Sequence, residues 1–94
     1  MCTSIVEATP VEGSGLSRDG WFPLSQAVVS YDHPHYAWLE DAIVIDFLDP
    51  AAGPGARAAV ELSLESAKAL RQILDRAIAA AEEEEAEVRP AAAA

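Results

Sequence analysis

The fold of this chain is decided by a stretch near its C-terminus, SLESAKALRQILDRAIAAA, which spans residues 63–81. Ser63 is a favourable N-cap, and Glu65 suits the positive end of a helix dipole. Apolar residues recur at intervals of three and four, with charged residues on the other side, as in an amphipathic helix. The apolar positions are Leu64, Ala67, Leu70, Ile73, Leu74, Ala77, Ile78 and Ala81. The pattern predicts a long helix that packs on another layer.

Upstream of this helix, several segments have the alternating pattern of half-buried strands. Residues 24–31, 41–48 and 57–62 alternate apolar with polar or small side chains. Residues 2–8 contain β-branched residues and add a first strand, which Pro10 places at a sheet edge or interrupts. We therefore predict an α+β fold: a four-stranded, mainly antiparallel sheet with one long C-terminal helix packed on one face.

The helix is predicted to cover the more apolar face of that sheet. The side chains expected beneath it are Ile43, Ile45, Phe47, Val60 and Leu62. Residues 1–81 are expected to form this single α+β domain. After Ala81, four consecutive glutamates repel one another at the negative end of the helix dipole. Residues 82–94 are therefore predicted to be an acidic, alanine-rich tail, frayed or disordered.

Charge and size limit the classes of partner. The chain has 94 residues, 16 acidic and 6 basic, for a net charge of −10. Nucleic acids and anionic lipids require clustered Lys and Arg, so neither is expected as a partner. A single domain this small buries a modest core, and a homodimer would add buried area. A protein partner or a second copy of the chain is therefore the expectation.

Cysteine content and hydropathy bear on the compartment. Cys2 is the one cysteine, which rules out an internal disulfide framework. No run approaches the length of a membrane span, and no charged segment followed by an apolar one marks a signal peptide. A cytoplasmic location is expected.

The connection between the second and third predicted strands, YDHPHYAWLED at residues 31–41, is the chemically richest part of the chain. His33 and His35 flank Pro34, which favours an extended backbone and so places both imidazoles on one face. Cys2, His33, His35 and Asp41 are therefore candidate ligands for a transition metal such as zinc. The alternative is that both histidines are polar loop residues beside a proline turn, and the sequence favours this second interpretation.

The same connection has the composition of a protein-binding surface. Tyr31, Tyr36 and Trp38 are candidate interface residues, because aromatic side chains anchor protein interfaces. The function expected is that of a small acidic accessory or binding protein that acts through residues 31–41. The alternative is a small enzyme that uses His33 with a neighbouring carboxylate for acid–base chemistry. No residue is assigned a catalytic role.

Scattered motifs along residues 1–80 resemble a group of short actinobacterial proteins that begin Met-Cys-Thr. The resemblance rests on Met1-Cys2-Thr3, Gly13-Ser14-Gly15, Gly20-Trp21-Phe22, Asp32-His33-Pro34, Ile45-Asp46-Phe47, Gly53-Pro54, Ala56-Arg57 and Val60-Glu61-Leu62. That family is uncharacterised, so the resemblance implies no activity.

Overall fold

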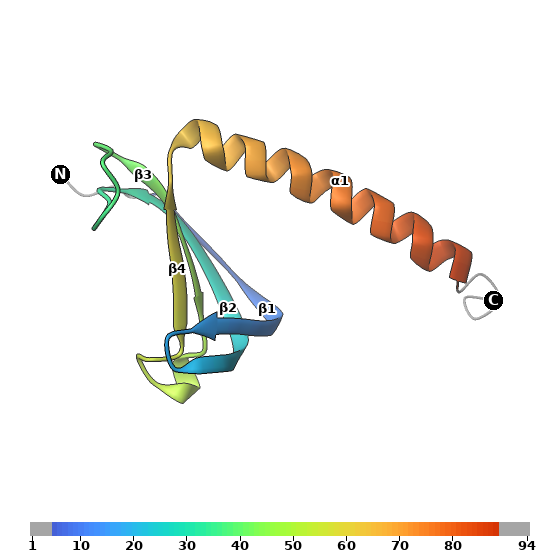
Figure 1. The fold of residues 1–94 in the computed structure, drawn as a ribbon, viewed down its shortest axis with the longest axis horizontal. Coiled ribbons are helices and arrows are strands. Elements are labelled where there is room, and N and C mark those ends of the chain that lie inside the picture. Colours follow the sequence, from blue (N-terminus) through green and yellow to red (C-terminus); the bar gives the residue numbers. More distant parts are fainter. Residues whose placement is uncertain (1–4, 89–94) are drawn as a thin grey trace. The chain divides into compact units, whose positions relative to one another are not determined.

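The computed structural model describes residues 5–88 and confirms the α+β fold, a four-stranded antiparallel sheet with one long C-terminal helix (Figure 1). The elements follow one another as β1 (Val6–Ser17), β2 (Gly20–Asp32), β3 (Ala42–Leu48), a short 3-10 turn η1 (Pro50–Ala52), β4 (Arg57–Leu62) and α1 (Leu64–Val88). The strands lie in the order β1-β2-β3-β4, and each pairs antiparallel with the next.

The first hairpin extends further than the sequence pattern predicts. The strand β1 runs on to Ser17, well past the first strand predicted at residues 2–8, and a tight turn at Arg18 and Asp19 leads into β2. The register shifts between Pro10 and Gly13, so one extra residue of β1 is accommodated in a bulge. Such bulges bend a strand, and β1 bends sharply along its length in Figure 1. The bulge lets the ladder continue after Pro10, which lacks the N–H donor.

The two faces of the sheet differ in burial. Ile45 of β3 lies opposite Val29 of β2 and Val60 of β4, and both valines are exposed. The buried apolar side chains among the described residues are Ala42, Val44 and Ala56. Ala42 and Val44 alternate with Ile43 and Ile45, so they lie on the opposite face of β3. On β3, Ile43 and Ile45, two of the residues expected beneath the helix, are therefore more exposed than Ala42 and Val44.

The helix α1 begins directly after Ser63, as predicted, and continues past Ala81 to Val88. Within α1 the apolar stripe is exposed: the exposed fractions of Leu70, Ile73, Leu74 and Ile78 lie between 40% and 55%. The packing of this stripe on the sheet stays a prediction. No residue of α1 is buried.

The chain divides into two compact units, one up to Leu64 and one from Glu65 onward. The domain boundary expected at residue 81 stays a prediction. Within residues 5–88, no helix combines the length and apolar character needed to cross a membrane.

Candidate functional site

The candidate site is the connection between β2 and β3, residues 33–41, called here the β2–β3 loop. Asp32 and Ala42 pair across its base, so the loop begins and ends at neighbouring points of the sheet. At its start, Asp32 Oδ1 accepts a hydrogen bond from the backbone N–H of His33 at 2.7 Å. The sheet therefore fixes both ends of the loop.

The centre of the loop is held by a carboxylate from another strand. Glu61 of β4 accepts hydrogen bonds from the backbone N–H groups of His35 (2.5 Å), Tyr36 (3.0 Å) and Ala37 (2.9 Å). Glu61 lies opposite Val44 in the register, so its side chain is on the same face as Val44 and Ala42. Three consecutive backbone donors that converge on one anion form a concave anion site of the kind that also binds phosphate or carboxylate ligands. Here the anion belongs to the protein itself.

These hydrogen bonds also change the acidity of Glu61. The bonds from Ala37 and His35 lower the pKa of Glu61 most, and the bond from Tyr36 and the charge of His35 act in the same direction. Partial desolvation opposes them but does not reverse the shift. A carboxylate that accepts several backbone N–H bonds is stabilised in its charged form. Glu61 is therefore an anion at neutral pH, and it holds the loop in that state.

A second set of contacts closes the base of the loop. His33 Nδ1 lies 3.3 Å from Asp41 Oδ1 and 3.1 Å from the carbonyl oxygen of Glu40. Both partners come from the far end of the loop, so the His33 side chain bridges its two ends. The pairing of His33 with a carboxylate, expected for acid–base chemistry, is present with Asp41. The His33–Asp41 pair also has a structural role, because it joins the two ends of the loop.

The predicted metal ligands are only partly brought together. His33 and Asp41 are adjacent, whereas His35 contacts Glu61 through its backbone N–H. Cys2 lies outside the described residues. Within residues 5–88, no group of three or more His, Cys, Asp or Glu side chains is placed to hold a metal ion. The described part of the chain therefore gives no support to a zinc centre, which needs three or four converging ligands.

The predicted interface residues separate into two groups. Tyr31 is a half-buried residue of β2, paired with Ile43 of β3. Tyr36 and Trp38 are in the loop, where the exposed fraction of Tyr36 is 90% and Trp38 is fully exposed. Leu39, which was not among the predicted interface residues, is also exposed in this loop. The exposed apolar surface of the loop therefore consists of Tyr36, Trp38 and Leu39.

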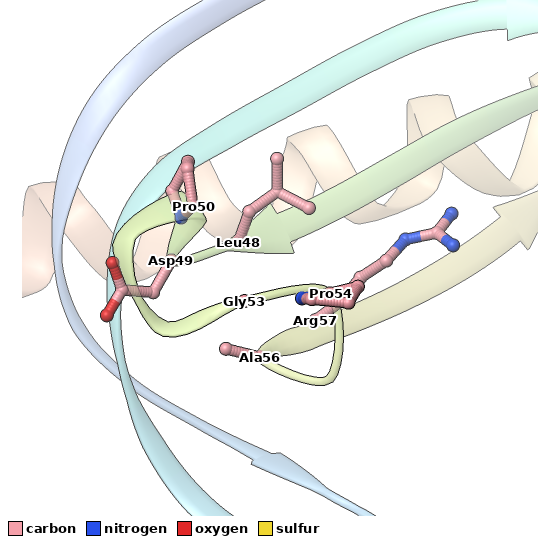
Figure 2. Close-up of a pocket in the computed structure, with 7 residues that line it drawn as sticks. All are labelled: Leu48, Asp49, Pro50, Gly53, Pro54, Ala56 and Arg57. Atoms are coloured by element: carbon pink, nitrogen blue, oxygen red, sulfur yellow. The ribbon is translucent and has the colours of Figure 1, made fainter.

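A shallow pocket lies at the other end of β3, in the connection to β4 (Figure 2). Its volume is about 380 Å³, and its lining includes Leu48, Pro50, Pro54 and Arg57. In Figure 2 the carboxylate of Asp49 points away from the other labelled side chains. Neither histidine lines this pocket, so it offers no enclosed site in which His33 could act on a substrate.

Sequence reasoning missed Glu61. In the sequence, Glu61 is the polar member of an alternating strand and looks like any solvent-facing glutamate. Its role depends on the three N–H donors, which lie 24 to 26 residues earlier in the chain. No local pattern marks that contact, because it arises from the β3–β4 register.

The sheet, the helix and this loop define a small α+β protein that displays aromatic side chains on a strand-to-strand connection. The chain belongs to a family of unknown function, DUF6295, whose model matches residues 1–87. This membership confirms the resemblance to an uncharacterised family. No curated protein and no solved structure matches the chain.

Proposed function

We propose that this protein is a protein-binding module whose contact surface is formed by Tyr36, Trp38 and Leu39 of the β2–β3 loop. The observation that supports this most is the full exposure of Trp38 on a loop whose backbone is held by Glu61. Exposed tryptophan and tyrosine are costly to leave in water and are enriched among the residues that dominate binding energies.

The anchoring of the loop also favours binding. A flexible loop loses conformational freedom when a partner orders it, and that loss subtracts from the affinity. In this loop the backbone at residues 35–37 is already held by Glu61, and the two ends are joined by His33. Tyr36 and Trp38 are therefore presented from a backbone that needs little further ordering.

The charge of residues 1–64 supports one kind of partner. Residues 1–64 contain nine acidic and two basic residues, for a net charge of −7. Two of these acids, Glu40 and Asp41, lie within the loop, and a third, Asp32, directly precedes it. Complementary charges guide association and reject partners of like charge. The partner we propose is a protein with an apolar pocket for the indole of Trp38 and a basic rim around it.

The test compares two exposed tryptophans. Trp21, in the β1–β2 hairpin, is also exposed, so Trp21→Ala is a matched control for Trp38→Ala. A partner captured by the wild-type protein is purified, and its affinity for each variant is measured by calorimetry. We expect Trp38→Ala to weaken binding by roughly thirtyfold or more, as for a dominant interface residue. Trp21→Ala should leave the affinity unchanged.

The opposite pattern counts against the proposal. If Trp38→Ala and Tyr36→Ala both bind the purified partner as tightly as the wild-type protein, the loop is not the contact surface. If charge reversal at Glu40 and Asp41 strengthens binding, the partner does not have the basic rim proposed here.

A further inference from the structure

The helix α1 carries a second exposed surface, its apolar stripe. Leu70, Ile73, Leu74 and Ile78 recur along one side of the helix, and each is at least 40% exposed. A helix with such a stripe normally buries it, because transfer of these side chains from water is favourable. We therefore expect another protein surface to cover the stripe. The charges of the same helix indicate what that surface is.

Charge is distributed unevenly along α1. Residues 64–76 contain three of the six basic residues of the chain and two acids, for a net charge of +1. Residues 77–88 contain five glutamates and no basic residue, for a net charge of −5. The helix nevertheless continues through these glutamates to Val88, although acidic residues are unfavourable at the negative end of a helix dipole. A basic surface beside the second half of α1 would offset this repulsion.

Within the chain, the most concentrated basic segment is the first half of the same helix. The other two basic residues among those described are Arg18 and Arg57, and Arg57 is already paired with Asp46. Residues 1–64 are strongly acidic. The charge pattern of α1 is therefore complementary to that of a second α1 running in the opposite direction. A parallel pair would instead place the two glutamate segments side by side.

We infer that α1 pairs antiparallel with α1 of a second copy of this chain, with the two helices crossing near Ile78. Arg71, Ile78 and Glu85 are spaced by seven residues, so they lie in one row along the helix, at the border of the apolar stripe. A two-fold axis beside Ile78 brings Arg71 of each copy next to Glu85 of the other. The apolar stripes then face each other, and each glutamate segment lies beside a basic one.

The first experiment measures the mass of the full-length protein by sedimentation equilibrium in single and double charge variants. The wild-type protein should have twice the monomer mass. Arg71→Glu and Glu85→Arg should each weaken the dimer by roughly tenfold, because each places like charges together across the interface. The double variant R71E/E85R should recover the wild-type affinity. Residues 71 and 85 of one helix are about 21 Å apart, so the recovery cannot arise within one copy.

This double variant also reports the direction of pairing. In a parallel dimer residue 71 faces residue 71 of the other copy, and the double variant gains no opposite charges. Arg76→Glu is the matched control, because Arg76 lies five positions from Arg71 and on the other side of the helix. It should weaken the dimer much less than Arg71→Glu.

The second experiment traps neighbours by disulfide formation in a Cys2→Ser background. Ala77→Cys, close to the crossing point, should cross-link two copies. Val88→Cys should not, because its two copies lie roughly 30 Å apart in the antiparallel pair. Trp38→Ala should leave the dimer intact, so failure of the loop proposal and of this one can be told apart. A monomeric wild-type protein, or cross-linking through Val88→Cys, would overturn the antiparallel pairing.

Discussion

The carboxylate of Glu61 lies 2.9 Å from the backbone nitrogen of Ala37, a residue 24 positions earlier in the chain. With the bonds from His35 and Tyr36, this contact ties the β2–β3 loop to β4. The centre of the loop that presents Tyr36 and Trp38 is therefore held by one side chain. Loss or protonation of the Glu61 carboxylate should therefore change the conformation of the loop.

Removal of the Glu61 carboxylate should release the loop. We expect amide hydrogen exchange at residues 35–37 to become several-fold faster in Glu61→Ala, because all three N–H groups lose their acceptor. Glu61→Gln should have a smaller effect, since its carbonyl oxygen still accepts hydrogen bonds. Glu40→Ala removes a carboxylate within the same loop and serves as the control. Equal exchange in wild type, Glu61→Ala and Glu40→Ala would contradict the anchoring role.

Acid should release the loop through the same residue. The pKa of Glu61 is lower in the folded protein than in the unfolded chain, so its stabilising contribution is fully present above the unfolded value of 4.5. That contribution is lost as the pH falls through the lower, folded-state pKa. In a Trp21→Phe background, Trp38 fluorescence should report this transition below pH 4.5. Glu61→Gln should show no such transition, and an unchanged pH profile in that variant would assign it to another group.

A side chain at Gly20, in the β1–β2 turn, should destabilise the folded protein. Its φ is +117°, a conformation that residues with a Cβ rarely adopt. Gly20→Ala should lower the free energy of unfolding by about 1–3 kcal/mol, the usual cost of a strained backbone. Gly13→Ala is the control, because a Cβ at Gly13 meets nothing within 4 Å and its φ is not positive. Its stability should stay within about 0.5 kcal/mol of wild type in thermal unfolding.

The Arg57–Asp46 pair should make a small, salt-sensitive contribution. Arg57 Nη2 and Nε both lie 2.7 Å from Asp46 Oδ1, and the exposed fractions of the two side chains are 51% and 20%. A double-mutant cycle with Arg57→Met and Asp46→Asn should give an interaction energy of about 0.5–1 kcal/mol. The Lys68–Glu65 pair of α1, 3.4 Å apart and exposed, should give less. An Arg57–Asp46 energy unchanged in 1 M NaCl would contradict an electrostatic origin.

The sequence predicted helices and strands well where the apolar residues follow a single helical or strand periodicity. The three-and-four spacing around Leu70, Leu74 and Ile78 marked α1, and the alternation at 42–48 and 57–62 marked β3 and β4. The extent of β1 was missed, because Pro10 and the glycines at 13 and 15 are typical of loops. The bulge that lets this strand continue depends on its pairing with β2.

The candidate site was predicted in part. The loop and its exposed aromatics, Tyr36 and Trp38, were identified from composition. Its anchor, Glu61, was not. Tyr31 lies in β2, as the alternation of residues 24–31 predicted. Ligand convergence at His33 and His35 could not be judged from an H-x-H spacing, because the direction of each side chain depends on the backbone path.

The sequence by itself determined the order and type of the elements, the acidic charge and the position of the aromatic loop, since these follow from residue periodicity and composition. Only the tertiary structure decided that Glu61 holds the loop and that Ala42 and Val44, rather than Ile43 and Ile45, are the less exposed residues of β3. The physical reason is that hydrogen-bond partners and burial depend on strand register. Register brings together residues whose separation in the chain leaves no local signal.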